Sequence, residues 1–356
     1  MNDVNKVKYE MSINTLAMCA NDEEIWMAHG TLPLLMKYDF KIDKITMARV
    51  IPCNFEGKVP RALFKAIYQK GSDIFLIPNN ARELIIYSIG NDQFTSIPIE
   101  NPRQNMFCGC SEKENKLYFV PYKYHKMVSF DLETHEVEYL AEWKKYNQEQ
   151  LCINDFCEYN QKLICVIWNM NFLMEYDFDR KKWNKIDINT KEDGFSQICK
   201  TRDELCLYNS NQGHLLLLSP EKYYIKKTSK LDMGDACLFE CINNNVIVDS
   251  INENTWMIID DEINLRKYTN TAEKISTVSK PQWKFGTWIN YHNKYEIGID
   301  TENHLIKISD DKIIVKELIL ESDVLEQIKK SNDIYHLINY ENEICLLPGF
   351  IDEIIK

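Results

Sequence analysis

The sequence lacks the short motifs by which many enzymes are recognised. It contains no Gly-rich phosphate loop, no Ser/His/Asp signature and no dinucleotide fingerprint. Its 12 cysteines include no C-x-x-C pair, and its 7 histidines show no H-x-H or H-x-x-x-H spacing. A nucleotide-driven enzyme is therefore not a leading hypothesis, and we expect no cofactor and no bound metal.

Positive charge and long apolar runs are also scarce. The formal net charge is −12, and the one basic stretch, residues 222–230, is typical of a solvated outer strand. No run approaches the roughly 20 apolar residues of a membrane helix, and the first residues lack the apolar core of a signal peptide. Cysteines such as Cys165 and Cys345 lie within apolar runs, as reduced core thiols do. We expect a cytoplasmic protein with neither nucleic-acid nor membrane partners.

One unit recurs along the chain and is clearest over residues 114–140. A polar turn precedes a short apolar strand, and after a polar loop a second strand ends in Phe130-Asp131. A further turn and an alternating strand complete the unit. The first apolar strand of each copy begins, at steps of 41 to 49 residues, at Ile25, Ile74, Leu117, Leu163, Leu205, Val246, Tyr295 and Ile344.

A period of 40–50 residues made only of strand signals indicates propeller blades. We expect an all-β fold, in which residues 1–356 form a single β-propeller of about eight four-stranded antiparallel blades. Strands in each blade are named A, innermost, to D, outermost. The unit described above supplies B, C and D, and the apolar run before its first turn supplies A, as at residues 63–68. The last copy ends within strand C, so the strand at residues 7–11 would close the last blade; the alternative is seven blades plus a C-terminal appendage.

A short helix is expected at about residues 322–331, before the last blade. Ser322 would cap it, and Val324, Leu325 and Ile328 would form its apolar face. Because it follows a D strand, it would lie on the face that carries the B–C loops and cover part of that face.

The repeat resembles the blades of Kelch and galactose-oxidase-like propellers across nearly the whole chain. It departs from the true Kelch repeat by containing no Gly-Gly, and it lacks the WD40 dipeptides and the sialidase Asp box. The resemblance therefore implies an architecture and transfers no catalytic residue.

The B–C loops differ between blades while the strands repeat, as expected where a scaffold carries its function on loops. Amide and aromatic side chains there suit a protein segment or a saccharide-like ligand, although Asn and Gly also serve tight turns. The candidate ligand-binding residues are His29, Asn79, Asn80, Arg82, Tyr122, Tyr124, His125, Trp168, Asn169, Asn171, Asn211, His214, Asn252, Asp300, Asn303 and His304.

Two functions fit this surface. The first is a binding or interaction scaffold whose partner contacts the B–C face. The alternative is a carbohydrate-active hydrolase or lyase that uses His or carboxylates at the channel mouth, where Asp300, Glu302 and Glu253 come from neighbouring blades. The recurring Tyr-Asp and Phe-Asp pairs belong to the frame, since a strand-end Asp satisfies the backbone of the following turn.

Overall fold

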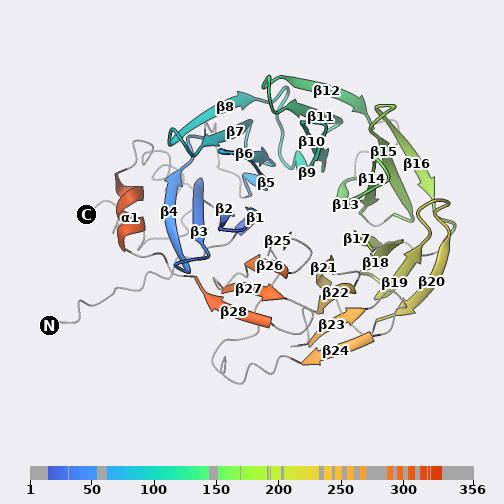
Figure 1. Cartoon of the computed structure of the whole chain (residues 1–356). Coiled ribbons are helices and arrows are strands. Elements are labelled where there is room, and N and C mark those ends of the chain that lie inside the picture. Colours follow the sequence, from blue (N-terminus) through green and yellow to red (C-terminus); the bar gives the residue numbers. More distant parts are fainter. Residues whose placement is uncertain are drawn as a thin grey trace.

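The computed structural model is a ring of four-stranded antiparallel sheets, seen along its axis in Figure 1. The structure describes residues 15–330, except 31, 54–61, 144–150, 169, 191, 193, 202–203, 232–235, 243–244, 251–254, 260–264, 270–286, 292–294, 300–303, 309–312, 319 and 321. Within these residues seven sheets are formed, each from four strands consecutive in sequence. No helix among them is long and apolar enough to cross a membrane.

Each sheet begins at the centre of the ring and ends at its rim (Figure 1). The first sheet contains β1 (Thr15–Ala20), β2 (Glu24–His29), β3 (Leu34–Asp39) and β4 (Lys44–Val50). The second contains β5 (Phe64–Lys70), β6 (Asp73–Pro78), β7 (Glu83–Ser88) and β8 (Gln93–Pro98). The third contains β9 (Phe107–Lys113), β10 (Lys116–Pro121), β11 (Lys126–Asp131) and β12 (Val137–Glu142).

The remaining sheets follow the same order. The fourth contains β13 (Ile153–Tyr159), β14 (Lys162–Ile167), β15 (Phe172–Asp177) and β16 (Lys182–Asp187). The fifth contains β17 (Phe195–Lys200), β18 (Leu205–Asn209), β19 (His214–Leu218) and β20 (Ile225–Lys230). The sixth contains β21 (Ala236–Ile242), β22 (Asn245–Ser250), β23 (Thr255–Ile259) and β24 (Leu265–Thr269), and the seventh contains β25 (Thr287–Tyr291), β26 (Tyr295–Ile299), β27 (His304–Ile308) and β28 (Ile313–Glu317).

The predicted β-propeller is confirmed, and so are seven of the predicted strand starts, from Ile25 to Tyr295. Seven sheets are formed within the described residues and β1 contacts β25 directly, which favours the seven-blade alternative over a count of about eight. Residues 7–11, proposed to close the last blade, and the last repeat at Ile344 both lie outside the described residues.

The predicted helix is present as α1 (Ser322–Lys329), with Val324 and Ile328 fully buried. Its expected position over the B–C face is wrong, because α1 packs on the outer strand β4 at the rim (Figure 1). The Gln327 side chain donates to the carbonyl of Thr46 at 3.2 Å and accepts from Arg49 at 2.8 Å.

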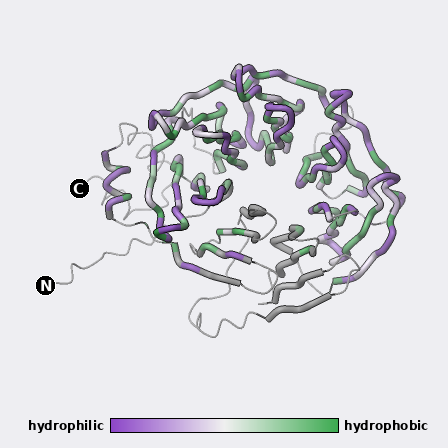
Figure 2. Tube along the Cα trace, in the orientation of Figure 1, coloured by the Kyte–Doolittle hydropathy of each residue, from purple (hydrophilic) through white to green (hydrophobic). Residues whose placement is uncertain are grey.

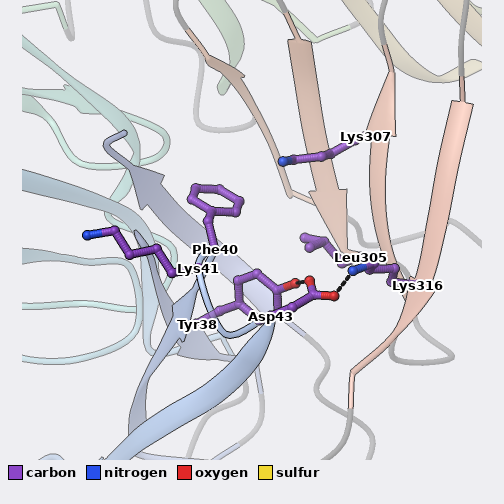
Figure 3. Close-up of a pocket in the computed structure, with 7 residues that line it drawn as sticks. All are labelled: Tyr38, Phe40, Lys41, Asp43, Leu305, Lys307 and Lys316. Carbon is purple, nitrogen blue, oxygen red and sulfur yellow. Dashed lines mark hydrogen bonds and ion pairs between the residues drawn. The ribbon is translucent and has the colours of Figure 1, made fainter. Parts of the chain in front are cut away.

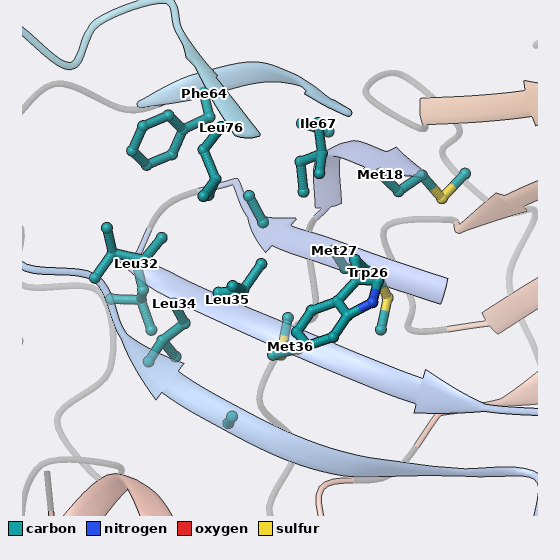
Figure 4. Packing of buried hydrophobic residues seen from close by; sticks show 14 of the residues in the cluster. Met18, Trp26, Met27, Leu32, Leu34, Leu35, Met36, Phe64, Ile67 and Leu76 are labelled. Atoms are coloured by element: carbon teal, nitrogen blue, oxygen red, sulfur yellow. The ribbon is translucent and has the colours of Figure 1, made fainter. Parts of the chain in front are cut away.

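Apolar side chains fill the space between neighbouring sheets. In the first five sheets the second strands are buried along almost their whole length, and β6, β10 and β14 leave only their first residue half-buried. Figure 4 shows Trp26, which is fully buried, packed with residues of the first two sheets such as Met36 and Leu76. Hydrophilic residues recur along the rim strands in Figure 2, as expected for strands with one solvated face.

The strand-end aspartates behave as predicted. Asp39 Oδ1 accepts the backbone N–H groups of Lys41 and Ile42, at 2.7 and 3.3 Å. Asp131 Oδ1 does the same for Glu133 and Thr134, at 3.0 and 2.9 Å. These bonds hold the turn between the third and fourth strands of a sheet, so the aspartates are structural.

Close packing between inner strands makes one glycine sensitive. A Cβ at Gly109 on β9 would lie 2.5 Å from Cε1 of Phe156 on the adjoining β13, whereas a Cβ at Gly90 would meet nothing within 4 Å. We expect Gly109→Ala to lower the free energy of unfolding by about 1–3 kcal/mol through overpacking. The matched Gly90→Ala change should be nearly neutral. Urea unfolding of both variants checks this. Equal midpoints would show that the Phe156 side chain can move away without cost.

Candidate functional site

Six of the seven described inner strands share a backbone irregularity at the end where they enter the ring. A β-bulge interrupts the pairing of β1, β5, β9, β13, β17 and β21 with their second strands. Each bulge lies one or two residues from the start of the strand, at the end that adjoins the B–C loops. Bulges redirect side chains and are common beside functional sites. The extra residues in the second to fifth sheets are Lys65, Cys108, Asn154 and Ser196.

Three of the inner strands bring a charged pair and a thiol together. Lys65 on β5, Cys108 on β9 and Asp155 on β13 influence each other electrostatically. Lys65 has an exposed side chain although protein surrounds it, as expected for a residue that faces the ring axis. Burial lowers the pKa of Lys65, and Cys108 and Asp155 partly offset this effect.

Asp155 is held by backbone donors of two sheets. Its Oδ2 accepts the N–H of Ile198 on β17 at 2.8 Å, and its Oδ1 accepts the N–H of Phe156 at 2.9 Å. Burial nevertheless raises the pKa of Asp155 from 3.8 to about 7, and the two hydrogen bonds and the charge of Lys65 oppose that rise. A carboxyl group near the axis therefore changes its charge around neutral pH.

Backbone hydrogen bonds join two predicted aromatic residues to the residues that lead into β13. The carbonyl of Tyr122 accepts the N–H of Ile153 at 3.2 Å, and the N–H of Trp168 donates to the carbonyl of Cys152 at 3.0 Å. The B–C loops of the third and fourth sheets thus flank the residues that lead into β13. The Tyr122 hydroxyl also hydrogen-bonds the Cys152 thiol. We call Tyr122, Lys123, Trp168 and Asn171 the Tyr122–Trp168 surface.

One aromatic side chain on this surface, Trp168, is unusually exposed. Trp168 is 44% exposed, Tyr122 is half-buried, and Lys123 and Asn171 are exposed. The Lys123 ammonium lies 5.6 Å from the centre of the Tyr122 ring. Exposed aromatic faces beside polar groups can contact apolar and hydrogen-bonding parts of the same partner.

Several other predicted site residues hold the loops instead of facing solvent. His29 is buried, and its Nδ1 accepts the N–H of Leu32 at 3.0 Å. Asn79 and Asn80 both donate to the carbonyl of Ala62, at 3.1 and 3.2 Å. Asn80 also accepts the N–H of Asn105 at 2.7 Å. These side chains fix the loops that enter the inner strands, so their primary role is structural.

The third sheet shows the same use of polar groups. Tyr124 is fully buried, and its hydroxyl donates to the carbonyl of Glu100 at 2.5 Å. His125 is half-buried with its ring 4.7 Å from that of Tyr124. Tyr124 therefore ties its loop to the loop that precedes β9, and His125 packs against it.

The fifth sheet places a histidine and a carboxylate together at the B–C end. His214 Nδ1 lies 2.9 Å from Oε1 of Glu192, and both side chains are half-buried. Asn209 donates to the other oxygen of Glu192 at 3.4 Å. Glu192 was not predicted, because it lies in the loop before β17 and outside the B–C loops.

The remaining predicted residues divide into two groups. Arg82 and Asn211 are exposed on their loops. Asn169, Asn252, Asp300 and Asn303 lie outside the described residues, as does the side chain of His304. Among the described residues no group of three or more His, Cys, Asp or Glu is placed to hold a metal ion.

Comparison with known proteins shows the fold alone. No family model matches the chain, and no curated protein matches it in sequence. Virginiamycin B lyase from Staphylococcus aureus is similar in structure, with a TM-score of 0.66, 10% identity and coverage of 85% of this chain and 97% of that one. YCF48 bound to D1 peptide has a TM-score of 0.65 and 9% identity, with coverage of 86% of this chain and 95% of that one. BamB from Moraxella catarrhalis has a TM-score of 0.56 and 8% identity, with coverage of 82% of this chain and 83% of that one.

These neighbours are β-propeller proteins, which agrees with the ring described above. They do not single out the Kelch or galactose-oxidase-like type, so that subtype stays a resemblance of the sequence.

The raised pKa of Asp155 predicts a pH dependence of stability. A carboxyl whose pKa is higher in the folded state favours folding while it is protonated. Its contribution is therefore complete below about pH 4 and is lost as the pH rises through about 7. We expect the free energy of unfolding of the wild type to fall between pH 5 and 8 relative to that of Asp155→Asn, which has no carboxyl group to ionise. Urea unfolding over this pH range measures the difference.

Asp131 provides a control of opposite sign. Backbone hydrogen bonds from Thr134 and Glu133 lower its pKa, so its contribution is present at neutral pH and is lost as the pH falls below the unfolded value. The effect of Asp131→Asn should therefore be constant from pH 5 to 8. Parallel pH profiles for wild type and Asp155→Asn would contradict the assignment.

Proposed function

We propose that this protein is a binding scaffold that captures an extended segment of a protein partner on the Tyr122–Trp168 surface. The observation that carries the proposal is the backbone pairing that puts Tyr122 and Trp168 on either side of Cys152 and Ile153, with Trp168 44% exposed. Aromatic side chains with a fixed backbone lose little entropy on binding and dominate the energetics of many interfaces.

The rigidity of the loops supports binding over catalysis. Asn79, Asn80 and Tyr124 each bond to a backbone group of a neighbouring loop, and His29 bonds within its own loop, so the loops of this face are organised before a partner arrives. The Cys108 thiol on the inner strand β9 is not activated, because burial raises its pKa far above neutral pH. YCF48, a structural neighbour bound to a peptide, is a precedent for peptide binding by this fold.

We place the protein in the cytoplasm as part of the same proposal. The ten described cysteines are all free thiols and none is fully exposed. Burial raises the pKa of Cys19, Cys53 and Cys110, so these thiols are slow to oxidise. A chain rich in such thiols suits a reducing compartment.

Site-specific photo-crosslinking in native cells tests the surface. A photo-reactive phenylalanine analogue at position 168 should give a discrete protein adduct, because the side chain would lie in the interface. Tyr224 is the matched control, since it is 51% exposed and lies in the turn between β19 and β20 on the opposite face. Position 224 should give no such adduct, and Tyr122→Ala should reduce the yield at position 168.

Mass spectrometry of the crosslinked species identifies the partner and checks its specificity. Equal adducts at positions 168 and 224, or an adduct at 168 that Tyr122→Ala leaves unchanged, would show that the aromatic surface is not the binding site. An adduct containing a saccharide rather than a peptide would retain the face and change the class of ligand.

A second candidate function rests on the His214–Glu192 pair. A histidine oriented by a carboxylate can remove or deliver a proton, which a carbohydrate lyase or hydrolase requires. Virginiamycin B lyase shows that the fold can carry lyase activity, and a variant of that enzyme with one histidine replaced by alanine is catalytically inactive.

The enzymatic alternative makes a direct prediction. If the pair is catalytic, incubation with a panel of acidic and neutral polysaccharides should release reducing or unsaturated ends, and His214→Ala and Glu192→Gln should each lower the rate by at least roughly 100-fold. The Tyr224→Ala variant, which is changed on the opposite face, is the control and should keep the wild-type rate. Absence of turnover across the panel, or turnover that survives both changes, would rule out this role for the pair.

A further inference from the structure

A cavity of about 370 Å³ lies between the first and seventh sheets. Its lining comes from the end of β3, from the turn that follows it, and from the two outer strands β27 and β28 (Figure 3). The lining residues are Tyr38, Phe40, Lys41, Asp43, Leu305, Lys307 and Lys316. Because turns between third and fourth strands lie opposite the B–C loops, the cavity is separate from the Tyr122–Trp168 surface.

The junction beside the cavity has an isoleucine at a position that holds an aromatic ring at three other junctions. At three other junctions a ring on the second strand of one sheet contacts a ring of the next: Trp26 with Tyr87, Phe75 with Phe130, and Tyr118 with Phe178, at centroid distances of 5.7, 5.7 and 4.8 Å. The matching residue of the seventh sheet is Ile297, which pairs with Lys307 as Trp26 pairs with Lys37, so this position carries no ring.

A lysine contacts the first sheet at this junction instead. The Lys307 ammonium lies 4.3 Å from the centre of the Phe40 ring. Lys307 is half-buried, and burial lowers its pKa. A nearby anion would offset that cost by stabilising the charged form.

Charge in the cavity is opposite to that of the whole chain. Three lysines and one aspartate line it, in a protein with a formal net charge of −12. Lys316 forms an ion pair with Asp43, whose other oxygen accepts the Tyr38 hydroxyl (Figure 3). Lys41 pairs with Glu23 at 3.1 Å, but both side chains are more than 70% exposed. Such a pair contributes little, so the long Lys41 side chain can turn towards a bound anion.

We propose that this cavity binds a small dianion that carries a planar apolar group. Lys307 and Lys41 would hold the negative charges, and Phe40 and Leu305 would contact the planar part. A ligand held by residues of both sheets would bind only the closed ring, and would therefore stabilise the folded state.

Phenyl phosphate and phthalate are suitable probes, because both carry two negative charges on an aromatic ring and they distinguish a phosphate from a carboxylate source. Calorimetric titration at constant ionic strength should show binding of at least one of them, tighter than inorganic phosphate or phenol. The melting temperature should rise with the concentration of the probe that binds.

Lys307→Met removes the charge and keeps the apolar stem, and we expect it to weaken binding by roughly tenfold or more. In Phe40→Leu, phenyl phosphate or phthalate should bind no more tightly than inorganic phosphate. The matched control is Lys113→Met, because Lys113 lies 4.8 Å from the ring of Phe178, the counterpart of Phe40 in the fourth sheet, and does not line the cavity.

Each outcome decides for or against the site. Loss of binding in Lys307→Met with retention in Lys113→Met supports it, provided that urea unfolding shows both variants folded. Equal losses in both variants would show a general effect of charge, and unchanged binding in Lys307→Met would place the anion elsewhere. Failure of both aromatic dianions to bind would overturn the proposal, while leaving the Tyr122–Trp168 surface unaffected.

Discussion

The inner strands β1 and β25 lie side by side, and this contact joins the last sheet of the described ring to the first. An open row of sheets would leave two apolar faces without a neighbour, as the end repeats of a solenoid do. Closure removes both faces, so Ile297 and Leu305 of the seventh sheet share one core with Trp26 and Tyr38 of the first. Every loop on the B–C face depends on this closure for its position.

Aromatic packing contributes more to the junctions between sheets than the ion pairs beside it. Arg49 and Asp92 form a two-pronged pair across the first junction, and Lys181 with Glu138 across the third. Their side chains are 27% to 53% exposed, so each pair contributes at most about 1 kcal/mol. Truncating a buried ring such as Trp26 costs about 3–5 kcal/mol. The rings therefore hold the sheets together, while the charges favour one alignment.

The repeat could be predicted from the sequence because every copy solves the same local problem: an apolar strand, a turn and a strand-end aspartate. Closure could not, because a list of strand starts that includes Ile344 counts copies and does not say which sheets touch. The same limit applies to the site. Asn79, Asn80 and Tyr124 were predicted as ligand contacts, but their partners Ala62, Asn105 and Glu100 are backbone groups brought near only by the fold.

Lys65 and Asp155 were missed for a related reason, although each gave a signal. Both are charged residues within inner-strand segments that are otherwise largely apolar, Phe64–Tyr68 and Ile153–Phe156. What makes them neighbours is the bulge at the start of β5 and of β13, which depends on pairing with the second strand and leaves no motif. Exceptions to a repeat thus carry two kinds of information here. A charge in an apolar strand indicates the ring axis, and an isoleucine at the position of Trp26, as at Ile297, accompanies the junction that has space for a ligand.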